Sequence, residues 1–422
     1  MPAVAIARTR ERHRSPESVL SLVNDAIEKI GGIASFIKPG QTVLIKPDQS
    51  VPAPAETGST TDPLMIGALI RLARIAGASR IQVAGSSEGC LDAFRCMRET
   101  GLAAIAEREG AQIIDLSRNA TRQIDVPGAS APRRAALPVA LIESDVMIAA
   151  PKAKTHPFDQ IAGTIQLWSG LVSPNWRAAH QMEDMVGSYA DLMTIIRPDL
   201  CVTDALICGE GDGPGAHVPH WCGCVLASTD PVAMDVSIAL LLGCDPRSLR
   251  FAAAGEQQGV GSRAPIVWLG TGIEQVAFHS WKSHPDFQHL PINVLVGKHV
   301  TMAGTIGRTR NALDILLRRG ELERILCSGR TPTVMIGDIE DPQFERHLNQ
   351  GPYLVLDDAA RPVYKNNPSV LFIGGHPIQR DLLPDLLKWL NADKRDKKLR
   401  PAAKWAAMAI GAALALRALS RS

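Results

Sequence analysis

The chain has 422 residues, and its 45 Lys plus Arg nearly balance its 43 Asp plus Glu, giving a formal net charge of +2. Such a balance provides no long-range field that would attract nucleic acid, so a nucleic-acid-binding role is disfavoured. The hydrophobic fraction of 45% and charged fraction of 21% are typical of globular proteins. The length exceeds what one hydrophobic core usually organises, so we expect roughly two or three domains.

Eight cysteines are scattered along the chain, mostly within apolar runs. This distribution is typical of reduced thiols in a core and not of a disulfide framework. Residues 1–16 alternate Arg with polar residues and lack the apolar segment of a signal peptide. We therefore expect a cytoplasmic protein.

From Val43 onward, short β-branched runs alternate with helical patterns, which predicts an α/β fold with a largely parallel sheet and flanking helices. Two helices are expected to follow Asp62-Pro63 and Asp230-Pro231, where a carboxylate can cap and a proline can fill the first turn. Both carboxylates could serve only as caps. The expected strands are Val43 to Ile45, Ile81 to Ala84, Ile113 to Leu116, Val146 to Ala150, Leu200 to Thr203, Val225 to Ala227 and Ile266 to Leu269.

Residues 1–278 are expected to form the main α/β domain. A linker is expected at 279–290, because its apolar residues follow neither the helical nor the strand periodicity. A second, smaller α/β domain is expected at 291–392. Its predicted elements are a strand Ile292 to Val296, a helix Arg308 to Cys327, and strands Thr333 to Ile336, Tyr353 to Leu356 and Val370 to Ile373.

The last residues, 393–422, combine a basic stretch with the apolar run Trp405 to Leu416. As a helix this run would reach only about 18 Å, against a hydrocarbon core of about 30 Å. One interpretation is a helix that lies on the inner face of the membrane, with its cations on lipid phosphates. The other is a helix that packs on the protein or on another copy.

The densest polar signal follows the strand Val146 to Ala150, where Lys152, Lys154, Thr155 and His156 lie close together. Ligands of α/β sheets bind at the carboxyl ends of strands. Two lysines can fix an anionic group, Thr155 can bind substrate, and His156 titrates near neutrality and could move a proton. The alternative is that both lysines are solvated loop residues.

An earlier strand ends in the same manner, with Lys46 and Asp48, and is followed by a Pro/Ala stretch that leads to Thr60 and Thr61. We interpret Asp48 as a candidate catalytic group and Lys46, Thr60 and Thr61 as candidate substrate ligands. If this strand neighbours the one ending at Ala150, the two sets converge.

A third polar segment, residues 208–215, reads as a glycine-rich loop. Gly211 and Gly213 could let the backbone approach and cradle an anion. Glu210 and Asp212, with Asp204, could instead hold a divalent metal through oxygen ligands. A plain turn is the third interpretation, and the spacing matches neither a P-loop nor a dinucleotide fingerprint.

The stretch His217 to Cys224 offers four soft ligands, His217, His220, Cys222 and Cys224, without zinc-finger spacing. Packed thiols are favoured over a metal, since both cysteines would share one face of a strand. No run of four clustered cysteines occurs, so no iron–sulfur cluster is expected from this chain alone.

Five strings, in order over about 190 residues, resemble the family known as domain of unknown function 362. They are Leu44 to Asp48, Thr60 to Pro63, Pro151 to His156, Gly211 to Pro214 and Ser228 to Asp235. Members of that family often carry a ferredoxin-like segment with clustered cysteines, which this chain lacks. Electron transfer by this chain is therefore put in doubt.

Two departures from the family pattern stand out. Gln166 and Leu167 occupy the places where the family tends to have Lys-Asn, and Ile339 and Gly375 occupy places where some relatives have cysteines. The resemblance implies that the positive charge of the family lysine is missing at residues 166–167. It also implies that any metal which relatives hold near residues 339 and 375 is absent here. The Lys, His and Gly-rich pattern is also distantly similar to the nickel-pincer lactate racemases, at the level of fold analogy only.

Three hypotheses follow for function. The first is an enzyme on a small anionic, carboxylated substrate, with lysines fixing charge, His156 as acid or base, and a divalent metal as an optional aid. The second is a non-catalytic protein that binds an anion or metallo-cofactor and works with a redox partner at the membrane surface. The third is a degenerate scaffold. Substrate, metal identity and oligomeric state stay open.

Overall fold

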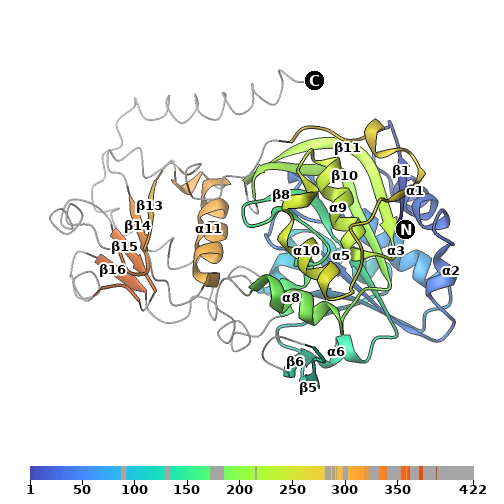
Figure 1. Ribbon diagram of the computed structural model, residues 1–422, viewed down its shortest axis with the longest axis horizontal. Coiled ribbons are helices and arrows are strands. Elements are labelled where there is room, and N and C mark those ends of the chain that lie inside the picture. Colours follow the sequence, from blue (N-terminus) through green and yellow to red (C-terminus); the bar gives the residue numbers. More distant parts are fainter. Residues whose placement is uncertain are drawn as a thin grey trace. The chain divides into compact units, whose positions relative to one another are not determined.

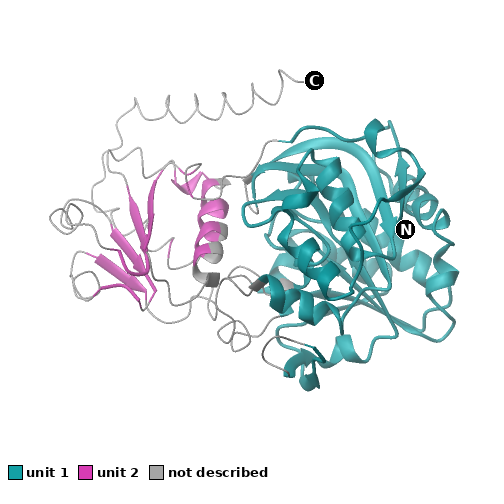
Figure 2. Cartoon of the chain, in the orientation of Figure 1, with its two compact units in different colours: residues 1–285 teal, residues 286–422 magenta. Residues whose placement is uncertain are grey.

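A computed structural model describes most of the first two-thirds of the chain and shorter stretches thereafter. The chain divides into two compact units, Met1–Pro285 and Asp286–Ser422 (Figure 2). This division falls within 279–290, while the predicted domain bounds themselves stay a prediction. The described residues are 1–86, 92–128, 134–171, 185–213, 216–280, 287, 290, 292–297, 303–318, 320–322, 332–339, 353–357, 359–361, 370–373 and 386.

A ten-stranded sheet forms the centre of unit 1 (Figure 1). Neighbouring strands are parallel except at β11, which runs antiparallel to both its neighbours, and in the β8–β9 hairpin. The predicted largely parallel α/β fold is therefore confirmed. The main order is β12 (Val267–Gly270), β1 (Ala3–Arg8), β11 (Ala216–Ser228), β10 (Leu200–Asp212), β7 (Val146–Ala150), β2 (Thr42–Pro47), β3 (Arg80–Gly85) and β4 (Gln112–Asp115).

Two further strands extend from this order: β8 (Lys152–His156) pairs with β10, and β9 (Gln160–Ala162) pairs with β8. A separate two-stranded sheet joins β5 (Thr121–Asp125) to β6 (Arg134–Pro138). The strands that precede Asp48 and Lys152 are neighbours, as the convergence of their polar residues requires. β2 and β7 pair in parallel from Val43↔Val146 to Pro47↔Ala150. Their carboxyl ends consequently lie side by side.

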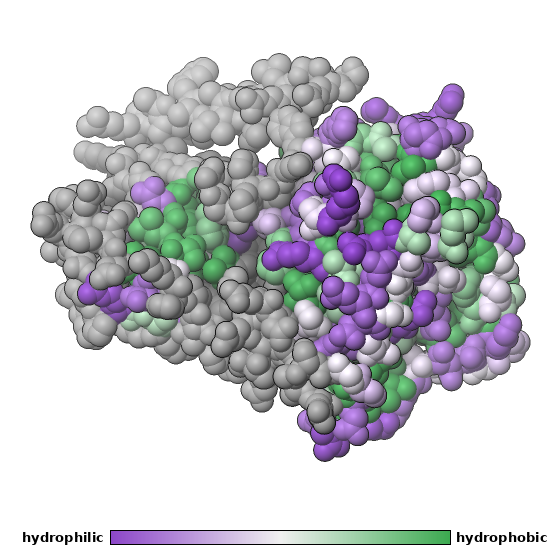
Figure 3. All heavy atoms as spheres, viewed as in Figure 1, coloured by the Kyte–Doolittle hydropathy of each residue, from purple (hydrophilic) through white to green (hydrophobic). Residues whose placement is uncertain are grey.

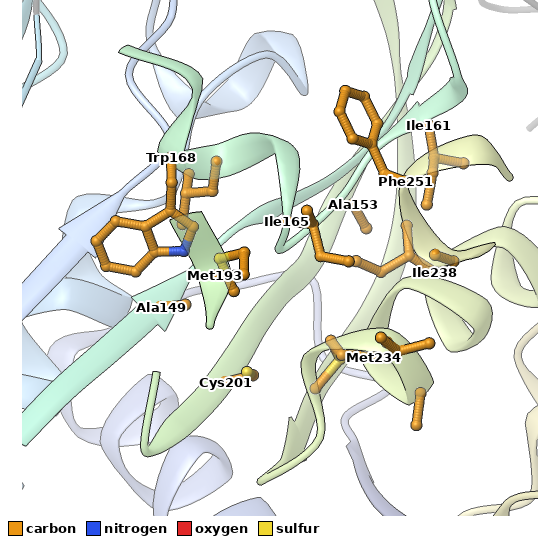
Figure 4. Packing of buried hydrophobic residues seen from close by; sticks show 14 of the residues in the cluster. Ala149, Ala153, Ile161, Ile165, Trp168, Met193, Cys201, Met234, Ile238 and Phe251 are labelled. Carbon is orange, nitrogen blue, oxygen red and sulfur yellow. The ribbon is translucent and has the colours of Figure 1, made fainter. Parts of the chain in front are cut away.

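Helices cover both faces of the sheet, which explains the nearly continuous apolar character of its central strands. One buried cluster joins the sheet to α1 (Pro16–Glu28), α2 (Ile33–Phe36), α3 (Pro63–Ile75), α4 (Ala93–Glu99) and α5 (Leu102–Arg108). The other joins it to α6 (Val139–Ile142), α8 (Met185–Met193), α9 (Pro231–Leu241) and α10 (Arg250–Gln257). Figure 4 shows part of the second cluster, in which Ile165, Ile238 and Phe251 pack together.

The two helix starts read from the sequence are present. Asp62 accepts a hydrogen bond from the backbone N–H of Leu64 at 2.8 Å and caps α3. Asp230 accepts one from Ala233 at 2.8 Å and caps α9. Each helix has proline in its first turn, where the missing N–H costs nothing.

Several strands of unit 1 were not predicted from the sequence, among them β1 and β8. β1 lies inside the sheet between β12 and β11, with Val4 and Ile6 completely buried, although the sequence suggested only a polar, Arg-rich start. β8 was expected as a loop. In both cases charged neighbours in the sequence concealed a short strand, and pairing with strands far along the chain determines the structure.

The predicted glycine-rich loop at 208–215 is wrong over its described part. Cys208 to Asp212 continue β10 and pair with β11 as far as Asp212↔Ala216. A Cβ atom at Gly209 would collide with the carbonyl oxygen of Gly58, and one at Gly213 would collide with the ring of His217. These glycines therefore allow close packing within the chain.

Unit 2 contains a parallel four-stranded sheet in the order β13 (Asn293–Val296), β14 (Thr333–Ile336), β15 (Tyr353–Leu356) and β16 (Val370–Ile373). Its helix α11 (Ala303–Arg318) begins before the predicted Arg308. Ile339 is buried beside Met335 and Tyr353. Gly375 and residues 393–422 lie outside the described residues.

Hydrophilic side chains cover much of the face of unit 1 seen in Figure 3. Within the described part of the chain, no helix has the length and apolar character needed to cross a membrane.

Candidate functional site

Strand β8 carries Lys152, Lys154 and His156 at alternate positions, so their side chains share one face of the strand. The residue exposures of Lys152 and Lys154 are 0% and 1%. The interpretation of these lysines as solvated loop residues is therefore wrong. A buried ammonium group requires a charged or strongly polar partner.

Lys152 has such a partner in Asp204, on the neighbouring strand β10. Its Nζ lies 2.8 Å from Asp204 Oδ2, and neither side chain is more than 1% exposed. The same carboxylate accepts the backbone N–H of Asp62 at 2.7 Å and that of Leu206 at 3.0 Å. Asp204 thus joins β8, β10 and the start of α3.

Asp62 faces this pair and also binds Arg14, which in turn pairs with Glu56. Burial and the nearby charge of Asp204 raise the pKa of Asp62 above its ordinary value. Arg14 was not identified by the sequence analysis, since nothing in a polar amino-terminal stretch indicates a partner so distant.

Lys154 holds the segment that follows β2. Its Nζ lies 2.8 Å from Asp48 Oδ2 and donates to Ser50 Oγ at 2.9 Å and to the carbonyl of Ser59 at 2.8 Å. These contacts match the three protons of an ammonium group. Asp48 and Lys154 therefore converge, as the sequence predicts for two neighbouring strands.

Burial alone would raise the pKa of Asp48. The charge and hydrogen bond of Lys154, the amide of Ser50 and the charge of Lys46 outweigh it and hold the pKa of Asp48 below its ordinary value. Lys46 is itself only 1% exposed, and its Nζ donates to the carbonyl of Pro47 at 3.1 Å. Asp48 therefore lies in the field of two ammonium groups.

The three threonines proposed as substrate ligands use their hydroxyls inside the protein. Thr60 donates to Ala53 at 2.7 Å, Thr61 to Ala150 at 2.8 Å and Thr155 to Gly211 at 2.7 Å. All three acceptors are backbone carbonyls, and all three threonines are completely buried. Thr60 and Thr61 therefore help to fix the segment around residues 48–62, whereas Thr155 joins β8 to β10.

His217 belongs to the same cluster, a role that sequence analysis missed when it treated the ring as a soft metal ligand. Its Nε2 lies 2.9 Å from the carbonyl oxygen of Thr155, and its Nδ1 lies 3.1 Å from Ser59 Oγ. A neutral ring with its proton on Nε2 satisfies both contacts, donating to the carbonyl and accepting from the hydroxyl. His217 thereby joins β11 to β8 and to the segment after β2.

The structure does not gather the proposed metal ligands. Among the described residues, no three His, Cys, Asp or Glu side chains are placed to hold a metal ion. Asp204 is bonded to Lys152, whereas Glu210 lies 4.0 Å from Nδ1 of His220. A metal held by Asp204, Glu210 and Asp212 would require a rearrangement.

His156, at the end of β8, is partly exposed and contacts Gln166. The backbone N–H of Phe158 donates to His156 Nδ1 at 3.1 Å, which places the proton of a neutral ring on Nε2. The amide nitrogen of Gln166 lies 3.3 Å from each ring nitrogen. The place where the family resemblance implies a lysine is therefore in direct contact with His156.

Gln166 begins the 3₁₀ helix η2 (Gln166–Leu171), which Asp235 of α9 fixes in place. The backbone N–H groups of Thr164 and Ile165 donate to Asp235, the second at 3.3 Å. Ile165 and Trp168 are buried on the same side of the sheet (Figure 4). Burial raises the pKa of Asp235 to about 7. Nothing in the sequence around Asp235 indicates this role.

A separate cavity of about 590 Å³ lies near the amino ends of β2, β3 and β4. Arg80, Gln112, Asp115 and Arg118 are among its lining residues, and none of the three buried lysines is. It is therefore distinct from the cluster described above.

The cluster lies within a stretch of the chain that matches a known family. Residues 43–239 match the family described as Domain of unknown function (DUF362). The chain contains a DUF362 domain. All five strings that carried the resemblance lie within the matched residues.

A relative of the chain is a thylakoid-associated protein of Synechocystis sp.. The two sequences are 25% identical over 287 residues, which cover 66% of this chain and 87% of that protein. This alignment extends well beyond the DUF362 domain.

Two solved structures align with most of the chain at 10% identity. The lactate racemase apoprotein from Thermoanaerobacterium thermosaccharolyticum has a TM-score of 0.28, with 93% of this chain and 91% of that chain covered. A protein from Thermotoga maritima has a TM-score of 0.32, with 81% and 77% covered. Scores this low do not establish a shared fold or function.

Replacement of Asp235 should change how stability depends on pH. Because its folded pKa of about 7 exceeds the unfolded value, the folded state binds the extra proton between these pH values. Stability contributed by this group is therefore lost as pH rises through that window, with a slope of at most about 1.4 kcal/mol per pH unit. Asp235→Asn should abolish this component in urea unfolding followed from pH 4 to pH 8.

The matched control is Asp25→Asn, since the Asp25 carboxylate is about half exposed on α1. The unfolding free energy of wild type minus that of Asp235→Asn should decrease as pH rises. The corresponding difference for Asp25→Asn should show no such decrease. A difference that stays constant or increases with pH would contradict the assignment.

Proposed function

We propose that the DUF362 domain is an enzyme that acts on a small carboxylated substrate at the carboxyl ends of β2 and β8. The observation that carries the proposal is the cluster of Lys46, Asp48 and Lys154, in which two ammonium groups surround one carboxylate. Ammonium groups at this position suit a substrate that carries a carboxylate. Carboxyl ends of parallel strands are the usual position of ligands in such sheets.

In this proposal Lys154 does not bind substrate directly, because its contacts with Asp48, Ser50 and Ser59 fix the walls of the site. Lys46 supplies charge to the substrate carboxylate. His156 shares the face of β8 with Lys154, is partly exposed and carries a ring that can move a proton near neutral pH. The proposal includes no metal, because Asp204, Glu210 and Asp212 are not gathered.

Small carboxylates should stabilise the purified full chain in thermal unfolding. At a hundred times its dissociation constant, a ligand adds about 2.7 kcal/mol, which corresponds to roughly 5–10 °C in Tm for a unit of this size. Acetate, pyruvate and malonate are suitable probes, with inorganic phosphate as a second anion. Lys46→Met should remove the shift, whereas His156→Ala should keep it.

His220→Ala is the matched control, because the ring of His220 stacks on Phe278 outside the cluster. It should keep the shift caused by a carboxylate. Absence of a shift with all three carboxylates, or an equal shift in Lys46→Met, would contradict the proposed substrate class.

Proton NMR in D₂O then distinguishes an enzyme from a binding protein. Wild type should exchange a carbon-bound proton of a bound carboxylate for deuterium, and His156→Ala should bind without exchange. Binding without exchange in wild type would favour the non-catalytic hypothesis.

We further propose that residues 393–422 contact an anionic membrane surface. Support comes from the basic stretch that precedes the apolar run, and from the thylakoid association named for the relative. Basic residues near an anionic surface contribute about 1 kcal/mol each, and a short apolar face adds a second signal.

The full chain should float with vesicles that contain phosphatidylserine, and less with neutral vesicles. Replacing Lys394, Arg395, Lys397 and Lys398 by Gln should reduce the bound fraction, whereas Arg247→Gln, at an exposed site, should not. Equal flotation of the two variants would exclude the surface contact.

A further inference from the structure

Cys222 and Cys224 flank a glycine at an irregular point of β11. The register with β10 shifts between Ala205↔Cys224 and Ile207↔Trp221, so β11 contains one residue more than β10 there. Gly223, between the cysteines, has φ +69°, and a Cβ atom there would collide with the carbonyl oxygen of Thr9. This is a β-bulge that only glycine fits comfortably.

The bulge brings two sulfur atoms together. Alternate residues of a regular strand point the same way but are separated by about 6.6 Å along the strand. In this structure the Sγ atoms of Cys222 and Cys224 lie 3.7 Å apart, and Cys224 Sγ lies 3.4 Å from the carbonyl oxygen of Cys222. Both cysteines are thiols.

A third thiol, Cys208 of β10, reaches Cys222 as well. Contacts with the thiols of Cys208 and Cys224 lower the pKa of Cys222, and the nearby His220 and Arg8 act in the same direction. Burial raises the pKa of Cys208, and the bond to Cys222 raises that of Cys224. Of the three thiols, Cys222 is the one whose pKa is lowered.

Of the three thiols, only Cys222 has any exposure to solvent. Cys222 is 8% exposed, whereas Cys208 and Cys224 are fully buried. The Sγ of Cys222 also lies 3.7 Å from the carbonyl oxygen of Val276, in the segment that covers it. Only a small oxidant could reach the sulfur without unfolding.

We propose that Cys222 and Cys224 form a redox pair that a hydroperoxide oxidises to a disulfide. With hydrogen peroxide, the Cys222 thiolate attacks one oxygen, an S–O bond forms, the O–O bond breaks, and the leaving hydroxide takes a proton to become water. Cys224 sulfur then attacks Cys222 sulfur, the S–O bond breaks, and hydroxide leaves with the Cys224 proton as a second water. Two thiols and one peroxide thus give one disulfide and two waters.

The test uses the purified, reduced full chain treated with increasing hydrogen peroxide, then acidified and blocked with a thiol alkylating reagent. Cleavage on the amino side of Asp212 and Asp230 places Cys222 and Cys224 together on one peptide without another cysteine. That peptide should lose the mass of two hydrogen atoms and resist alkylation, while circular dichroism of the treated chain stays native.

Cys224→Ala removes the second thiol and should trap the intermediate, so a cyclic dione that captures sulfenic acid should label Cys222. Cys201→Ala, at a buried thiol of the same sheet, is the matched control and should leave the disulfide unchanged. Oxidation that occurs only as the chain unfolds, or that joins Cys208 in wild type, would overturn the proposal. Absence of label on Cys222 in Cys224→Ala would also overturn it.

Discussion

The buried ion pair between Lys152 and Asp204 is the constraint on which the geometry of the DUF362 domain depends. Removing either charge from water costs several kcal/mol, and only the partner and the hydrogen bonds around it offset this cost. Asp204 also accepts the amides of Asp62 and Leu206, so one carboxylate fixes the relation between β8, β10 and α3. The second pair, Lys154 with Asp48, extends this arrangement to the segment after β2.

The exposed part of the site depends on a different set of contacts. Asp235 and the buried side chains of Ile165 and Trp168 position η2, and η2 places Gln166 against His156. The buried ion pairs of Lys152 and Lys154 thus fix one side of the candidate site. Asp235 fixes η2 on the other side. On this account, a family lysine in place of Gln166 would set a positive charge beside His156 and disfavour its protonated form.

Much of the fold could be predicted from sequence because its strands are apolar and its helices α3 and α9 begin with Asp-Pro. The convergence of Asp48 and Lys154 also followed, since both come after strands that proved to be neighbours. The burial of the lysines did not follow, because their partners are remote: Asp204 is 52 positions from Lys152. Gly209 and Gly213 resemble turn residues in sequence, and only their close contacts with Gly58 and His217 show why glycine is needed at these two positions.

A double-mutant cycle on Lys152 and Asp204, measured by urea unfolding of the full chain, tests this account most directly. Lys152→Met leaves a buried carboxylate without its cation, and Asp204→Asn leaves the ammonium without its anion, so each should cost about 3–5 kcal/mol. The double variant should cost clearly less than the sum of the two. Single variants that each cost under about 1 kcal/mol and add independently would contradict the claim that this pair organises the domain.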